Sequence, residues 1–197
     1  MSSRIRFPGA RAVFEAFPDL RRLAPPPQDD CASLDYARRL LAAPRANQAI
    51  AFLAHLLPRR EAIWWARHCV SALLGPRADD AALRAADLWV RAPDEDNRCA
   101  ALQIGNAGEP SAATTWLARA AAWSGGSMCP PELKRLPAPP AACAQAVNAA
   151  IMLAVCAGEP LGVMKRIAAC VEAGIRFAEG GDAHVSLPEA PVSSAPG

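Results

Sequence analysis

The clearest pattern of apolar and polar positions lies in residues 61–74. Apolar residues recur there at steps of three and four, while Arg67, His68 and Ser71 occupy the other side of the helical wheel. This period is typical of an α-helix with one buried face. The apolar stripe consists of Ala62, Trp65, Ala66, Cys69, Val70 and Leu73. The pattern therefore predicts a helix that packs through this stripe.

Similar patterns predict further helices separated by proline and glycine. Pro58 and Gly75-Pro76 bound the helix just described, because such residues begin or end helices. Ser33 is placed to cap one helix, and Asp94 stands at the acidic start of another, where carboxylates favour the positive end of the helix dipole. The other predicted helices cover residues 33–43, 44–57, 79–91, 94–107, 111–123, 141–157 and 161–178.

These elements predict an all-α fold. We expect residues 32–180 to form a single α-helical domain, a compact bundle of about seven to nine short helices arranged as helical hairpins, for which a HEAT-like stack is one arrangement. Residues 1–31 are expected to be an N-terminal arm with a short amphipathic piece around residues 10–16. The prolines of residues 128–140 predict a long Pro-rich loop. Residues 181–197, rich in Pro, Ser and Ala, predict a disordered tail.

Composition and charge narrow the class of protein. The chain has 197 residues, of which 52% are hydrophobic and 20% charged, enough for one core but not for several domains. Its 21 basic and 19 acidic residues are interspersed, so we expect no nucleic-acid partner. No apolar run approaches the length of about 18 residues that spans a membrane, so we expect no membrane partner. All but two of the basic residues are arginine, which we interpret as codon usage.

The cysteines and the N-terminal residues indicate a compartment. The 7 cysteines form no CxxC pair, which is typical of reduced thiols in the cytosol. Residues 1–8 lack the apolar stretch of a secretion signal. We therefore expect a cytoplasmic protein.

The sequence offers little chemistry. His55, His68 and His184 do not have the spacing of metal ligands, and no phosphate-binding or dinucleotide-binding motif is present. We expect no metal, no cofactor and no catalytic residue. One alternative stays open, a small helical enzyme or ligand-binding domain with a pocket lined by His68, Asp94, Arg98 and Cys99.

Trp64 is the one aromatic residue whose position is ambiguous. It lies roughly opposite the stripe that contains Trp65, and two adjacent residues of a helix cannot share one face. Either a second layer of helices covers Trp64, or Trp64 projects as an anchor for a partner, a role in which tryptophan is enriched.

Four segments resemble a bacterial domain family of unknown function. They are residues 52–66, 89–98, 123–127 and 146–150, and the most specific is Leu57-Pro58-Arg59-Arg60-Glu61-Ala62-Ile63-Trp64-Trp65. The resemblance implies an association with type VI secretion gene clusters, near VgrG spike and PAAR effector genes and thiolase-like partners. It carries over no catalytic residue. It implies a shared interface or a shared fold constraint at the motif residues, which are Arg59, Arg60, Trp64, Asp94, Glu95, Arg98, Ser124, Gly125, Gly126 and Ser127.

Three functional hypotheses follow. The first is a non-enzymatic accessory or adaptor protein, a cytoplasmic chaperone or assembly factor that binds a type VI secretion effector, a spike component or a thiolase-like protein. Trp64 and the loop after Trp123 are its candidate anchors. The second is the enzyme or ligand-binding domain named above. The third is a structural module whose partner is another copy of itself, a homo-oligomer.

Overall fold

The computed structural model describes residues 3–75, 80–130 and 133–187, and within them the fold is all-α, as the sequence predicts. Nine α-helices and one short 3-10 helix are present in these ranges, and no strand is formed there. The elements are α1 Ala10–Ala16, η1 Pro18–Arg22, α2 Ser33–Ala42, α3 Asn47–Leu56, α4 Arg59–Leu74, α5 Ala81–Arg91, α6 Glu95–Ala107, α7 Ala113–Ala122, α8 Ala142–Cys156 and α9 Val163–Ala178.

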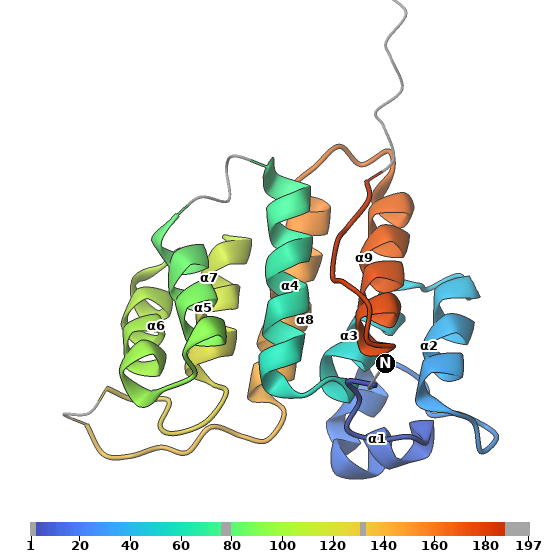
Figure 1. The fold of residues 1–197 in the computed structure, drawn as a ribbon, viewed down its shortest axis with the longest axis horizontal. Coiled ribbons are helices and arrows are strands. Elements are labelled where there is room, and N and C mark those ends of the chain that lie inside the picture. Colours follow the sequence, from blue (N-terminus) through green and yellow to red (C-terminus); the bar gives the residue numbers. More distant parts are fainter. Residues whose placement is uncertain (1–2, 76–79, 131–132, 188–197) are drawn as a thin grey trace, which may run out of the picture.

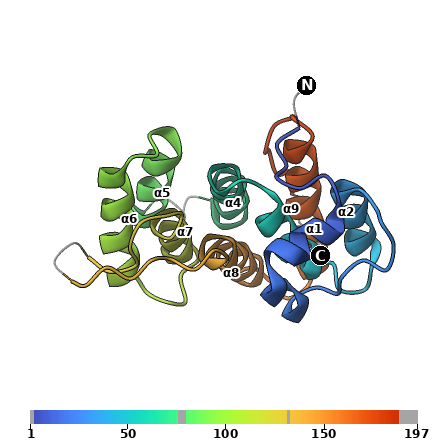
Figure 2. The same ribbon diagram turned by 90° about the horizontal axis from the view of Figure 1, so that it is seen from below.

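The longer helices lie side by side in two groups joined by a central pair. Figures 1 and 2 show α5, α6 and α7 on one side, α4 and α8 in the middle, and α9, α3, α2 and α1 on the other side. α7 packs mainly against α8 and α6, and α8 also contacts α4 and α3. The central pair therefore connects both halves through one continuous core.

Helix α4 packs through the predicted stripe. Ala62, Trp65, Ala66, Cys69 and Val70 are buried and Leu73 is partly buried, which confirms the helical period. The Trp65 indole nitrogen donates a hydrogen bond of 2.9 Å to the backbone oxygen of Cys170 in α9. Because a Cβ atom on Gly174 would lie 2.8 Å from the Trp65 ring, the approach of α9 to α4 requires glycine at that position.

The N-terminal residues form part of the hydrophobic core, whereas the sequence predicted a separate arm. Helix α1 matches the predicted amphipathic piece, and Val13, Phe14 and Leu20 are buried in the same core cluster as the rest of the domain. Ser33 is not the helix cap that we expected. It is the first residue of α2, and its hydroxyl donates a 2.6 Å hydrogen bond to the backbone oxygen of Phe7. This bond ties α2 to the N-terminal segment.

The segment after α9 also belongs to the folded body. Ala183 and Val185 are buried, and Figure 1 shows the extended segment running beside α9. The prediction of a disordered tail that begins at residue 181 is therefore wrong for this segment, because Ala183 and Val185 are buried. The rest of that predicted tail, residues 188–197, lies outside the described residues.

Arginine side chains occupy the carboxyl ends of the helices. In each of α5 to α9, a backbone oxygen in the last turn accepts a hydrogen bond from an arginine. The pairs are Arg60 with Val90, Arg119 with Gly105, Arg98 with Ala122, Arg166 with Val155, and Arg4 with Phe177. These oxygens have no partner within their own helix and carry the negative end of the helix dipole. A guanidinium group supplies both a donor and a positive charge, so each contact stabilises a helix end.

Candidate functional site

Most of the predicted motif residues gather at one end of the bundle. They lie at the start of α4, at the start of α6 and in the loop that follows α7, and Figure 1 shows these segments at the same end. The Arg59 guanidinium donates a 2.7 Å hydrogen bond to the backbone oxygen of Ser124, and the Arg60 Nε donates at 2.7 Å to Val90. Both arginines therefore connect the start of α4 to the ends of other helices.

The acidic residues at positions 94–96 begin helix α6, as expected. Asp94 is its N-cap, and the carboxylate accepts a 2.8 Å hydrogen bond from the backbone N–H of Asn97. Such a cap satisfies one of the free N–H groups of the first turn. Asp94 therefore has a structural partner.

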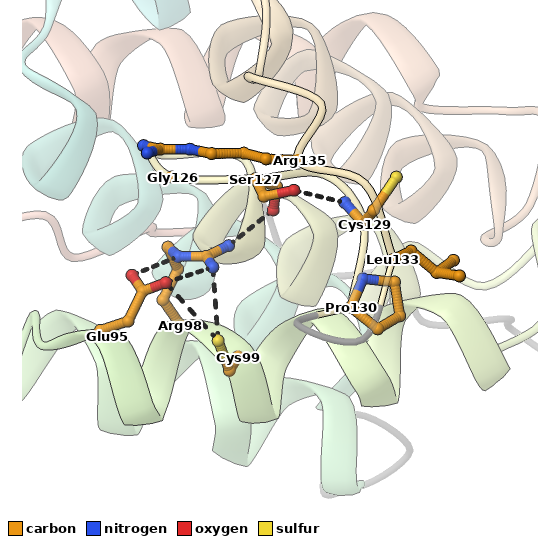
Figure 3. Close-up of a pocket in the computed structure, with 9 residues that line it drawn as sticks. All are labelled: Glu95, Arg98, Cys99, Gly126, Ser127, Cys129, Pro130, Leu133 and Arg135. Atoms are coloured by element: carbon orange, nitrogen blue, oxygen red, sulfur yellow. Dashed lines mark hydrogen bonds and ion pairs between the residues drawn. The ribbon is translucent and has the colours of Figure 1, made fainter.

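Arg98 is the most buried charged residue of this region, with 5% of its surface exposed. Its Nε and one terminal nitrogen form a bidentate pair with the Glu95 carboxylate at 2.7 and 2.6 Å. Its other terminal nitrogen donates to the backbone oxygens of Ala122 and Ser127 at 3.0 and 2.9 Å. A further contact of 3.3 Å reaches the Cys99 sulfur (Figure 3).

These contacts leave no donor on Arg98 for a ligand. A guanidinium group carries five N–H bonds, and Arg98 has five contacts to acceptors. The hydrogen bond from Arg98 lowers the pKa of Glu95, and the same bond raises the pKa of Arg98. The motif residues Glu95 and Arg98 thus act together as a clamp that holds the loop after α7.

Glycine is required where the loop crosses this clamp. Gly126 has a φ of 61°, and a Cβ atom there would lie 2.7 Å from the Arg98 Nε. Gly125, the neighbouring residue, would meet no atom within 4 Å. The Ser127 hydroxyl accepts hydrogen bonds from the backbone N–H groups of Cys129 and Leu136 at 3.1 and 3.2 Å. Ser127 therefore closes the base of the Pro-rich loop.

A surface pocket of about 380 Å³ lies between the clamp and the loop. Figure 3 shows its lining, which consists of Glu95, Arg98, Cys99, Gly126, Ser127, Cys129, Pro130, Leu133 and Arg135. Partial burial raises the pKa of the Cys99 thiol, which disfavours the thiolate, the reactive form of cysteine.

The structure does not bring together the four residues of the predicted enzyme pocket. Arg98 and Cys99 line the pocket beside the loop, whereas Asp94 and His68 are absent from its lining. The His68 ring instead packs edge-on against Trp64 on α4, with 4.8 Å between ring centroids. No group of three potential metal ligands occurs among residues 3–75, 80–130 and 133–187.

Trp64 is neither fully covered nor fully exposed. Its side chain is half-buried against the core, with the Arg67 and Arg91 guanidinium groups 5.8 and 6.0 Å from its ring. It lines a second pocket of about 270 Å³, together with residues of α5, α9 and the N-terminal segment.

The sequence interpretation missed two exposed leucines on the Pro-rich loop. Leu133 is 62% exposed and Leu136 is 54% exposed. A backbone hydrogen bond of 2.7 Å from Met128 to Leu136 and a bridge between Ser127 and Pro137 hold the two branches of the loop together. Leucines among the prolines of residues 128–140 were the available signal, because a purely solvated linker has few large apolar side chains.

Comparison with known proteins gives a family and no further relative. The model of a family of unknown function, DUF6931, matches residues 36–178. No curated protein and no solved structure matches the chain. Within the residues that the structure describes, no helix has the length and apolar character needed to cross a membrane.

Proposed function

Because the chain belongs to the DUF6931 family, whose function is unknown, we propose a role from its own structure: a non-enzymatic accessory protein that binds another protein through its Pro-rich loop. The observation that carries this proposal is the exposure of Leu133 and Leu136 on a loop held by the buried side chain of Arg98. A group of exposed large apolar side chains is typical of interaction sites, and Leu133 and Leu136 lie three positions apart in the chain.

The hydrogen bonds at the base of the Pro-rich loop support the proposal that the loop binds a partner. The clamp residue Arg98 and the Ser127 hydroxyl bond to backbone groups at the base of the loop. A loop that is ordered before it binds loses less conformational entropy on association. The base of the loop that carries the two leucines is thus held in place, beside a pocket of about 380 Å³ that a partner side chain can enter.

The polar groups around this pocket favour binding over catalysis. All five N–H bonds of Arg98 already have acceptors, and partial burial raises the pKa of the Cys99 thiol. An active site needs donors and nucleophiles that are free for the substrate. The pocket offers its leucine and proline side chains instead.

The partner class that we propose comes from the resemblance described above. It is a component of a type VI secretion system, either an effector, a spike protein or a thiolase-like protein, held in the cytoplasm before assembly. The compartment is part of the same proposal.

Capture from a lysate of the native host tests the proposal. A tagged chain is expected to recover a secretion component that mass spectrometry identifies. The double variant Leu133→Ser, Leu136→Ser is expected to lose it, because burial of one leucine contributes about 1.5–3 kcal/mol and a loss of that size weakens binding about tenfold or more.

The matched control is Leu161→Ser, in the connection between α8 and α9, where Leu161 is 86% exposed. This variant changes the same residue type away from the loop and is expected to retain the partner. Far-UV circular dichroism must show equal helicity in all variants. Recovery of the chain alone, as a monomer, or unchanged capture by the double variant would contradict the proposal.

A further inference from the structure

The pocket beside Trp64 has a lining that the proposed function does not use. It lies between α4, α5 and the end of α9, and its residues include Arg4, Arg60, Trp64, Val90, Arg91 and Phe177. Its volume of about 270 Å³ is slightly below the range of about 300–1,000 Å³ that is usual for small-molecule sites. It therefore suits one or two amino-acid side chains better than a cofactor.

The charges around this pocket are unbalanced. Three arginines line it, and Glu61 is the one acidic residue of the lining. The nearby Asp87 offsets part of this positive charge, because Arg91 and Arg67 lie 2.7 and 3.2 Å from its carboxylate oxygens, but the lining arginines still outnumber Glu61 and Asp87 together. The pocket thus carries excess positive charge, which favours a negatively charged ligand.

In each of these arginines, one guanidinium nitrogen donates to the protein and the other nitrogens are available to a ligand. Arg60 and Arg91 use Nε, for the Val90 oxygen and the Asp87 carboxylate respectively. Arg4 uses one terminal nitrogen for the oxygens of Phe177 and Gly181. The other nitrogens of these groups make no hydrogen bond to the described part of the chain. Each group is thus anchored at one point and retains donors that can bind a carboxylate.

The wall of the pocket is aromatic and fixed. The Trp64 ring packs edge-on against His68 and lies within 6.0 Å of the Arg91 guanidinium. The Arg4 guanidinium lies 4.3 Å from the centre of the Phe177 ring. Two contacts between an arginine and an aromatic ring therefore line one small cavity, so that a carboxylate and an apolar group can be bound together.

From this lining we propose that the Trp64 pocket binds an acidic peptide segment of a protein partner, in which an Asp or Glu carboxylate stands next to an apolar side chain. The carboxylate contacts the free ends of Arg60 and Arg91. The apolar side chain packs on Trp64. This site is separate from the Pro-rich loop and does not depend on the function proposed for that loop.

The experiment uses two peptides that differ only in charge. The probe is acetyl-Gly-Glu-Phe-Asp-Gly-amide, and its neutral match is acetyl-Gly-Gln-Phe-Asn-Gly-amide. Binding to the ¹⁵N-labelled chain is followed by NMR at the indole N–H signal of Trp64, which the variant Trp64→Phe assigns. The acidic peptide is expected to shift this signal to saturation, with affinity about tenfold above that of the neutral peptide.

Arginine variants identify the pocket as the source of selectivity. Arg91→Gln and Arg60→Gln are each expected to weaken binding of the acidic peptide about tenfold. Arg45→Gln removes the same charge from an exposed position between α2 and α3 and is expected to leave binding unchanged. Because Arg60 also holds the end of α5, the exposed Arg91 provides the variant that does not depend on that contact.

Three results would overturn this inference. They are the absence of a shift at Trp64, equal affinity for the acidic and the neutral peptide, and an equal loss of affinity in Arg45→Gln and Arg91→Gln. The double variant Leu133→Ser, Leu136→Ser must bind the acidic peptide as the wild type does. Failure of partner capture and failure of peptide binding are therefore distinguishable.

Discussion

Replacing Arg98 tests how much the clamp contributes to the fold. Arg98→Ala removes two hydrogen bonds from a buried charged group to the oxygens of Ala122 and Ser127. Hydrogen bonds of this kind contribute about 1.5–3 kcal/mol each. The pair with Glu95 adds less than about 1 kcal/mol, because 66% of the Glu95 side chain is exposed. We therefore expect a loss of roughly 3–7 kcal/mol in the free energy of unfolding.

Two variants of the same pair serve as comparisons. Arg98→Lys retains the charge, but an ammonium group cannot reach Glu95 and both backbone oxygens at once, so we expect about half of that loss. Glu95→Gln leaves the bonds to the backbone intact, and we expect a change of less than about 1 kcal/mol. The expected order of stability is wild type, Glu95→Gln, Arg98→Lys and Arg98→Ala.

Urea unfolding followed by circular dichroism measures these differences. A domain of this kind is stable by about 5–15 kcal/mol, so the loss in Arg98→Ala must lower the midpoint clearly at an unchanged m-value. Hydrogen exchange at the backbone N–H groups of Met128 and Leu136 reports on the loop itself. If Arg98→Ala unfolds like the wild type and both groups stay protected, the clamp has no such role and the reasoning is wrong.

Three further predictions concern a glycine, a histidine and the cysteines. Gly126→Ala is expected to destabilise the fold by about 1–3 kcal/mol, because of its positive φ and the contact with the clamp; Gly125→Ala, with open space around it, is the control, and equal urea midpoints would refute the steric argument. Burial lowers the pKa of His55 in the folded chain below its ordinary value of 6.5, so the unfolded chain binds more protons and stability must fall as the pH drops from 7 towards 5. His55→Leu should reduce that dependence in thermal unfolding, and an unaltered slope would count against it. Burial raises the pKa of Cys143 to about 12, whereas Cys156 is exposed; iodoacetamide at pH 8 should therefore modify Cys156 first, as read by peptide mass spectrometry, and early labelling of Cys143 would disprove its burial.

The helices were predictable because their signals are local. The stripe through Trp65 repeats within 14 residues of α4, and Asp94 caps the helix that follows it directly. Errors arose where the partner is distant in sequence. Serine is a common N-cap residue, but the Ser33 hydroxyl donates its hydrogen bond to the backbone oxygen of Phe7, 26 residues earlier. Val185 lies in a segment of tail-like composition and is buried all the same.

The residues of the clamp and of the loop that it holds could be selected from the sequence, but the contacts between them could not. Resemblance selected Arg98 and Ser127, and the structure brings them into contact across 29 positions of sequence. Sequence alone could not show that Arg98 has no free donor, because its acceptors are mostly backbone oxygens, which any residue type supplies. The excess of arginine, which we interpreted as codon usage, has a use in the structure at the ends of five helices.

The contact between the N-terminal segment and the end of α9 has a consequence for synthesis of the chain. Arg4 donates hydrogen bonds to Phe177 and Gly181, and its own N–H bonds to Ala178. Residues 3 and 4 can therefore form these hydrogen bonds only after residues about 175 positions later have been synthesised. At about 5–20 residues per second, the ribosome needs on the order of ten seconds or more to deliver that helix. During this interval Ser3 and Arg4 lack their partners at the end of α9, whereas Phe14 can already pack on Tyr36 and Phe52, so the first residues of the chain are the last part of the N-terminal segment to reach their final contacts.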